Sequence, residues 1–164
     1  MKKRHFLTAG AAMVGSAWLS PHLSRQANAM TTKKGPFSIT KTEAEWRKIL
    51  TPEQFEVLRK HGTERAGSSP LDHQFGKGTY HCAGCSLPLF ASATKFNSGT
   101  GWPSFYAPLA GAIGTSVDKS FFATRIEVHC NRCGGHLGHV FDDGPQPTGK
   151  RYCMNGVALK FIPA

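Results

Sequence analysis

Residues 125–133, Arg-Ile-Glu-Val-His-Cys-Asn-Arg-Cys, decide the fold class of this chain. The first five alternate between polar and apolar side chains, which is the period of a half-buried β-strand. This strand runs directly into a Cys-x-x-Cys pair, and a second pair, Cys82 and Cys85, follows another strand-like run at residues 78–82. Two such pairs in one small domain predict that two strand ends meet at a single metal ion.

The four paired cysteines predict structural zinc. Gly84 and Gly134-Gly135 are expected to permit the tight turns that aim the thiolates at one ion. Disulfides are the alternative where the compartment is oxidising. A redox Cys-x-x-Cys is less consistent with the sequence, because it usually begins a helix in a βαβ unit that is not visible here. We expect Zn²⁺ in a closed, non-catalytic site whose ligands are Cys82, Cys85, Cys130 and Cys133.

Residues 1–29 have the features of a cleaved secretory signal peptide. A positive Lys2-Lys3-Arg4 precedes an apolar run over residues 6–19, and Ala27-Asn28-Ala29 is a cleavage site. The apolar run is shorter than the roughly 20 residues that span a bilayer, so no stable membrane anchor is expected. The sequence thus predicts an exported, periplasmic protein. Lys3-Arg4 also resembles a twin-arginine signal with Lys in the first position, which leaves the export route open.

The mature chain is expected to be one compact domain with little affinity for nucleic acid. The signal carries four Lys/Arg residues and no acidic residue, so its removal lowers the net charge from +10 to +6. No long basic run remains, and nucleic-acid binding is therefore not predicted. Residues 30–41 read as a flexible basic arm, and residues 42–164 as a single domain. We expect a monomer.

The secondary-structure pattern of this domain is mainly β. Residues 42–61 read as helical, with a second start at Thr51-Pro52-Glu53-Gln54, where Thr caps, Pro takes the first helical position and Gln completes a capping box. Residues 63–78 read as a loop. Strands are expected at residues 78–82, 121–129, 139–141 and 157–161. Without a βαβ rhythm, the prediction is antiparallel sheets with a small N-terminal helical lobe.

The fifth cysteine, Cys153, has no partner in a Cys-x-x-Cys pair and is a candidate nucleophile. Its neighbours Lys150 and Arg151 are expected to favour the thiolate. An inert cysteine buried in a final strand is the alternative, because free cysteine is often buried.

Two further motifs accompany this cysteine. Residues 98–105, Ser-Gly-Thr-Gly-Trp-Pro-Ser-Phe, form a turn that either presents Trp102 at the surface or buries it in the core. Residues 136–141, His-Leu-Gly-His-Val-Phe, carry histidines that suit acid–base chemistry, metal binding or a plain surface role. Together they indicate a thiol nucleophile in a partly apolar pocket with a proton donor. A cysteine hydrolase is a weaker reading, since no oxyanion motif is recognisable.

These motifs and Arg151-Tyr152-Cys153-Met154-Asn155, in this order, resemble the methionine sulfoxide reductase B family over about residues 46–161. The resemblance implies reduction of the R epimer of methionine sulfoxide in oxidised proteins or peptides. It also implies a mainly β fold of coiled antiparallel sheets with a distal structural zinc. The implied catalytic residues are Cys153, His139, His136, Asn155 and Arg151, and the implied substrate-binding residues are Trp102, Phe141 and Phe105.

The chain departs from the family pattern at two positions. Many members have a resolving cysteine where this chain has Thr100, which predicts a one-Cys enzyme whose sulfenic acid is reduced by an external, thioredoxin-fold thiol. Gly156 stands where the family usually has Ser, and Asn155-Gly156 favours a tight turn that would re-aim Asn155. A zinc-ribbon module that binds nucleic acid or protein without turnover is the alternative function.

Overall fold

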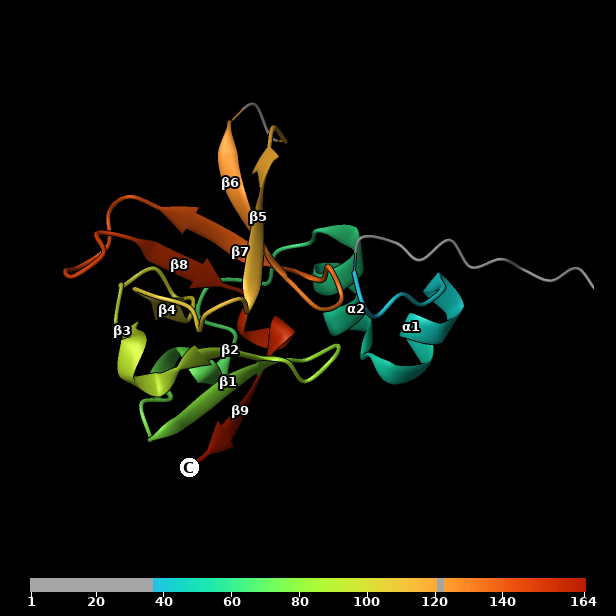
Figure 1. The fold of residues 1–164 in the computed structure, drawn as a ribbon, viewed down its shortest axis with the longest axis horizontal. Coiled ribbons are helices and arrows are strands. Elements are labelled where there is room, and N and C mark those ends of the chain that lie inside the picture. Colours follow the sequence, from blue (N-terminus) through green and yellow to red (C-terminus); the bar gives the residue numbers. More distant parts are fainter. Residues whose placement is uncertain (1–36, 121–122) are drawn as a thin grey trace, which may run out of the picture. The chain divides into compact units, whose positions relative to one another are not determined.

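The structure is a computed structural model that describes residues 37–120 and 123–164. These residues form two α-helices, α1 (Glu43–Ile49) and α2 (Pro52–Lys60), and nine strands in two antiparallel sheets (Figure 1). None of the helices among them is both long and apolar enough to span a membrane. The predicted signal peptide and residues 30–36 of the predicted arm lie outside the described residues.

The two helices begin at capping boxes. Thr42 and Glu45 form the first box, and Thr51 and Gln54 form the second, which is the one the sequence predicts. The extended backbone of Leu50 separates the two helices within the predicted helical region. Their buried faces carry Trp46, Phe55, Val57 and Leu58, so packing as well as capping holds these short helices in place.

The strands form a three-stranded and a six-stranded sheet, which confirms the predicted antiparallel, mainly β fold. The smaller sheet has the order β2-β1-β9 and the larger the order β3-β4-β8-β7-β6-β5. In chain order the strands are β1 (Gly78–Cys82), β2 (Pro88–Ala91), β3 (Lys95–Phe96), β4 (Ser104–Phe105), β5 (Ile113–Asp118), β6 (Arg125–Cys130), β7 (His136–Phe141), β8 (Arg151–Met154) and β9 (Leu159–Pro163). Three short 3₁₀ helices complete the described elements: η1 (Pro70–His73) before β1, η2 (Ser92–Thr94) between β2 and β3, and η3 (Gly156–Ala158) between β8 and β9.

Aromatic side chains from both sheets form the core. Phe105 of β4 stacks on Phe90 of β2 with ring centroids 4.4 Å apart, and it meets the edge of Tyr80 of β1 at 4.9 Å. All three side chains are fully buried, and burial of a large apolar side chain contributes about 1.5–3 kcal/mol. Burial also raises the pKa of Tyr80 to about 12, and its hydroxyl donates to the Gln74 carbonyl. This cluster therefore connects the sheet that carries Cys153 to the smaller one.

The start of the described chain packs against the second Cys-x-x-Cys turn. The Ile39 N–H donates to the Arg132 carbonyl at 3.0 Å, and the Phe37 ring meets the His129 ring with centroids 5.6 Å apart. A Cβ on Gly134 would lie 2.3 Å from Phe37, so that glycine leaves room for the aromatic ring. Residues 37–39 are therefore held on the domain, which shortens the predicted flexible arm at this end.

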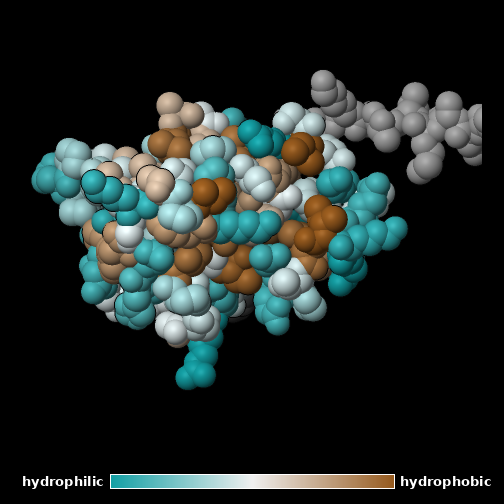
Figure 2. Space-filling model, turned by 90° about the horizontal axis from the view of Figure 1, so that it is seen from below, coloured by the Kyte–Doolittle hydropathy of each residue, from teal (hydrophilic) through white to brown (hydrophobic). Residues whose placement is uncertain are grey.

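The surface in Figure 2 is of mixed polarity: brown apolar groups are separated by teal hydrophilic ones. The exposed large apolar side chains of the described residues are Ile49, Phe75, Val117, Ile126 and Ile162. Val117 and Ile126 are direct partners across β5 and β6. Exposed apolar side chains in such small numbers are common on folded domains and identify no site by themselves.

Candidate active site

The four paired cysteines come together in one cluster. Their Sγ atoms all lie within 4.8 Å of one another. Cys82 lies 3.8 Å from Cys133, and Cys85 lies 3.4 Å from Cys130, so the close contacts join one pair to the other. Four sulfurs each 2.3 Å from one ion in a tetrahedron would be about 3.8 Å apart. The cluster thus suits a single tetrahedral metal ion with no open coordination position.

The two Cys-x-x-Cys turns have the same backbone geometry. The carbonyl of the first cysteine accepts the N–H four residues later, from Ser86 in one turn and Gly134 in the other, at 2.8 Å in both. These two residues are the ones with a left-handed φ, 57° for Ser86 and 66° for Gly134. The expectation for Gly134 is confirmed. That for Gly84 is wrong, because in the first turn a serine takes the left-handed position.

A separate small cavity of about 120 Å³ lies beside Cys153. Cys153 on β8 is the direct antiparallel partner of His139 on β7, so these two side chains are neighbours across the sheet. Trp102, from the turn before β4, and Asn155, just after β8, line the same cavity. The remaining lining residues are Thr63, Arg125, Gly138 and Phe141. Gly99 and Gly101 both have positive φ, which confirms the predicted turn before Trp102.

The Cys153 thiol lies in a partly buried, hydroxyl-rich environment. Its Sγ is 3.8 Å from Thr100 Oγ1, and Ser104 is its partner on β4. Burial raises the pKa of Cys153, an effect that the Thr100 hydrogen bond and the Arg151 charge oppose without reversing. Arg151 pairs with Asp143 and lies over the Phe141 ring at 4.4 Å. The expected thiolate-favouring environment is therefore not what the structure shows, because burial outweighs the positive neighbour.

Lys150 pairs with an aspartate and is not among the main influences on the Cys153 pKa, contrary to expectation. Its ammonium group is exposed and pairs with Asp142, which also raises the pKa of Lys150. Arg151 is thus the one of the two predicted basic neighbours that acts on Cys153.

His139 is paired with a carboxylate. Its Nε2 is 2.7 Å from Asp118 Oδ2, and Arg125 binds the same oxygen at 2.9 Å. Hydrogen bonds from Ser120, and then that from His139, hold the pKa of Asp118 well below its usual range. Burial lowers the pKa of His139, and the Asp118 bond only partly offsets this. A neutral imidazole whose Nε2–H donates to Asp118 leaves Nδ1 as the proton acceptor.

His136 lies deeper than His139 and does not line the cavity. It is 2% exposed, its ring centroid is 5.3 Å from that of His139, and its Nδ1 is 2.8 Å from Glu127 Oε1. Hydrogen bonding from His136, with further help from Ser116, lowers the pKa of Glu127 to about 2. His136 therefore contacts His139 and Glu127 and does not face the cavity in which a ligand would fit.

The match to known proteins covers most of the chain. The model of the SelR domain matches residues 50–163. The chain belongs to the peptide methionine sulfoxide reductase B family. A reductase of this name from Methanosarcina barkeri is 57% identical over 125 residues, which are 76% of this chain and 88% of the relative. One from Methylibium petroleiphilum is 52% identical over 134 residues, 81% and 97% of the two chains. The chloroplastic reductase B1 of Arabidopsis thaliana is 49% identical over 148 residues, 90% and 71% of the two chains.

The residues that resemble the reductase B motifs divide into three groups in the structure. Cys153, His139, Asn155, Trp102 and Phe141 line one cavity. Arg151 and His136 lie just outside it and contact its lining residues. Phe105 is fully buried in the aromatic core against Phe90, and we exclude it from the substrate-binding residues because no ligand could reach its ring.

Sequence reasoning missed Glu64, whose backbone holds two cavity residues. Its N–H donates to Asn155 Oδ1 at 2.9 Å, and its carbonyl accepts from Trp102 Nε1 at 3.3 Å. Asn155 Nδ2 in turn donates to the Leu137 carbonyl at 3.1 Å, so both ends of this amide are held. Burial raises the pKa of Glu64. Its position within a predicted loop gave no signal of this role.

Position 156 requires glycine because a side chain there would have no space, and not because the backbone forms a tight turn. It begins η3 and is not among the glycines with positive φ, so the expected Asn-Gly turn is not formed. A Cβ at Gly156 would lie 2.0 Å from Ser69 Oγ and 2.4 Å from Ser69 Cβ. Ser69 thus occupies the space that a side chain at position 156 would need, while its own hydroxyl accepts from Leu71 N–H.

We predict that Gly156→Ser destabilises the domain by about 1–3 kcal/mol, the usual cost of overpacking a filled site. Ser69→Gly in the same chain should restore most of that loss, because it removes the clashing atoms. Urea unfolding of the two single variants and the double variant measures this coupling. Additive effects of the two substitutions would contradict the assignment of the clash to Ser69.

Proposed function

We propose that this protein reduces the R epimer of methionine sulfoxide in proteins and peptides, with Cys153 as the nucleophile. The observation that carries the proposal is that the Cys153 thiol, the His139 imidazole, the Asn155 amide and the Trp102 indole line one cavity. The names of the relatives support methionine sulfoxide reduction, and this geometry gives each of the four side chains a role in it.

The proposed oxygen transfer starts from an uncharged Cys153 thiol and an uncharged His139 imidazole. Burial raises the pKa of the thiol and lowers that of the imidazole, so both groups are uncharged near neutral pH. His139 takes the thiol proton as sulfur attacks the sulfoxide sulfur, and it passes the proton to the sulfoxide oxygen. Attack forms an S–S bond, and the protonated oxygen then moves to the Cys153 sulfur as the substrate S–O bond and the new S–S bond break. Methionine leaves, and Cys153 remains as sulfenic acid. No net proton is consumed.

Asn155 and Trp102 would orient the substrate. One N–H of Asn155 Nδ2 is committed to the Leu137 carbonyl, and the second can donate to the sulfoxide oxygen. Trp102 is held through its Nε1–H to Glu64, which leaves the indole face for the substrate methyl group. A polar side for oxygen and an apolar side for methyl distinguish the two epimers at sulfur.

The site supports a one-Cys cycle. Thr100 occupies the position beside Cys153 where many family members carry the resolving cysteine, and the four remaining cysteines are clustered with one another. The sulfenic acid is therefore reduced by an external thiol, for which we propose a thioredoxin-fold protein. We further propose that the clustered cysteines hold Zn²⁺, because four thiolates favour that ion.

Thr100→Cys should convert the cycle to an intramolecular one. Thr100 Oγ1 is 3.8 Å from Cys153 Sγ, so a thiol at position 100 lies close enough for the oxidised Cys153 to react with it. After one equivalent of substrate without reductant, we expect a 100–153 disulfide in the peptide map. The Thr100→Cys, Cys153→Ser variant is the control. Persistence of the sulfenic acid in Thr100→Cys would contradict the proposed geometry.

We propose export to the periplasm on the basis of residues 1–29 alone. Expression of the full chain with fractionation and N-terminal sequencing of the product tests this. A mature N-terminus at Met30 in the periplasmic fraction is expected. A cytoplasmic protein that retains residues 1–29 would contradict it.

The activity is tested with the separate R and S epimers of a methionine sulfoxide peptide in excess dithiothreitol, which replaces an unknown physiological reductant. We expect turnover of the R epimer and none of the S epimer. A folded, metal-loaded protein that turns over neither would instead support the non-catalytic binding module.

A further inference from the structure

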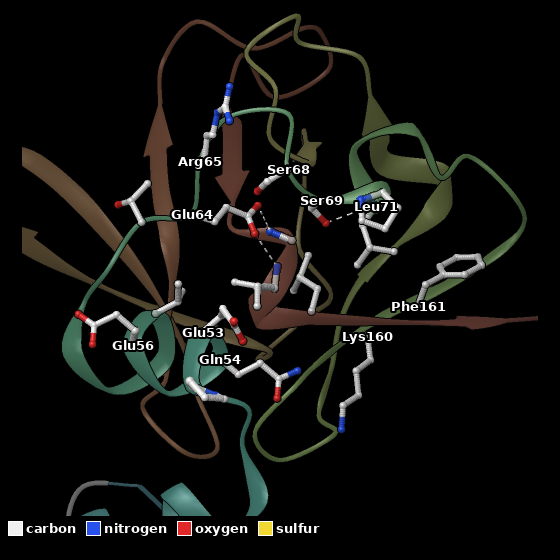
Figure 3. A pocket seen from close by; sticks show the side chains of 17 residues that line it. Glu53, Gln54, Glu56, Glu64, Arg65, Ser68, Ser69, Leu71, Lys160 and Phe161 are labelled. Carbon is white, nitrogen blue, oxygen red and sulfur yellow. Dashed lines mark hydrogen bonds between the residues drawn. The ribbon is translucent and has the colours of Figure 1, made fainter.

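Glu64 connects two walls of the proposed substrate cavity through its backbone and its side chain. The backbone bonds reach Asn155 and Trp102, as described above. The carboxylate points to the other side of the segment, into a larger cavity of about 1100 Å³ between α2, η1 and the η3–β9 segment (Figure 3). Thr63, which directly precedes Glu64, lines both cavities, so Glu64 follows the point at which they share a wall.

The carboxylate binds the start of η3. Its Oε1 accepts from the Gly156 N–H at 2.6 Å, and its Oε2 accepts from the Val157 N–H at 2.8 Å (Figure 3). These are the two N–H groups that directly follow Asn155 in the chain. No lysine or arginine in the described part of the chain forms an ion pair with Glu64, so these backbone donors are what compensate its partial burial.

We propose that Glu64 is a positioning residue whose carboxylate fixes the distance between the Asn155 amide and the Trp102 indole. The carboxylate holds the chain just after Asn155 against the segment whose carbonyl holds Trp102. Asn155 and Trp102 are the residues to which the proposed function assigns the sulfoxide oxygen and the methyl group, so this inference rests on that function. It adds a residue that sets substrate fit without touching the substrate.

The Glu64 carboxylate is not expected to affect the reactivity of Cys153. Cys153 is held by its β7 and β4 partners and by Thr100, none of which bonds to Glu64. Loss of the carboxylate should therefore weaken substrate binding while the intrinsic reactivity of the thiol stays the same. Glu64→Gln keeps the side-chain size but presents an NH₂ group to one of the two N–H donors.

The test compares wild type, Glu64→Gln and Glu53→Gln with the R epimer in excess dithiothreitol. Glu53 lines the same large cavity and is the matched control. For Glu64→Gln we expect KM to rise at least tenfold, with kcat and the rate of Cys153 alkylation by iodoacetamide within about twofold of wild type. Glu53→Gln should behave as wild type. An unchanged KM in a folded Glu64→Gln variant would overturn the proposal. Should that variant not fold, Glu64→Asp, which retains the charge on a shorter chain, takes the same test.

A readout that does not need turnover separates this inference from the proposed function. In Glu64→Gln, the NMR signals of the Trp102 indole N–H and the Asn155 side-chain amide should shift, while that of the buried Trp46 indole should not. Unshifted Trp102 and Asn155 signals would overturn the positioning role. Shifted signals in a protein whose wild type reduces neither epimer would retain the structural link and reject the activity.

Discussion

Replacement of Cys153 by serine is expected to abolish reduction of methionine sulfoxide, with kcat falling by about 10⁴-fold or more, as for loss of other enzymatic nucleophiles. The reason is chemical: serine oxygen cannot be oxidised to the equivalent of a sulfenic acid. Turnover of the R epimer with dithiothreitol measures the effect. The variant should keep its fold, because the hydroxyl replaces a partly buried thiol beside Thr100 and Ser104.

Controls for this variant are its thermal unfolding and its metal content, which should match those of wild type. Cys153 lies outside the four-cysteine cluster, so neither should change. Residual turnover within tenfold of wild type would show that another group accepts the oxygen, and the assignment of Cys153 would be wrong.

Removal of the metal should unfold the domain. Structural zinc contributes about 10–16 kcal/mol of apparent binding free energy in small domains, whereas a whole domain is stable by only about 5–15 kcal/mol. Cys82→Ser removes a fully buried member of the four-cysteine cluster at the end of β1, so it should lower both metal content and the unfolding temperature. Metal analysis and circular dichroism with and without a strong chelator measure these changes.

The expected stoichiometry is one zinc per wild-type chain and less in Cys82→Ser. Cys153→Ser is the matched control, since it also removes one thiol but should retain the metal. A metal-free wild-type domain that unfolds at the same temperature as the loaded one would contradict a structural role for the cluster.

Local sequence signals predicted the parts of the fold that depend on local chemistry. The capping box at Thr51 and the two Cys-x-x-Cys turns are such cases, because each is formed by residues within a few positions of one another. The bounds of β1 are also as predicted. Strands β3 and β4 have two residues each and carry no periodicity, so only their partners across the sheet define them.

Side-chain positions within a motif could not be read from the motif. Trp102 and Phe105 are three residues apart, yet one lines the cavity and the other is fully buried, because Phe105 belongs to a pairing with Phe90 of the other sheet. His136 and His139 likewise differ in depth and in carboxylate partner. These differences arise from contacts distant in sequence.

The electrostatics of Cys153 were predicted with the wrong sign for the same reason. Basic neighbours are visible in sequence, whereas the burial that dominates the thiol pKa is a property of the folded chain. The close approach of Ser69 to Gly156 and the hydrogen bonds of Glu64 are also contacts between segments far apart in sequence. These contacts explain why Gly156, which departs from the family pattern, is nevertheless well packed.

The measurement that tests the central claim most directly is a single turnover of the R epimer without any reductant, followed by dimedone labelling and peptide mapping. We predict one equivalent of methionine per chain, a dimedone adduct on Cys153 and four unmodified cysteines in the metal cluster. A disulfide between Cys153 and a cluster cysteine, with release of metal, would contradict the one-Cys account, because a cluster thiol would then be the resolving group.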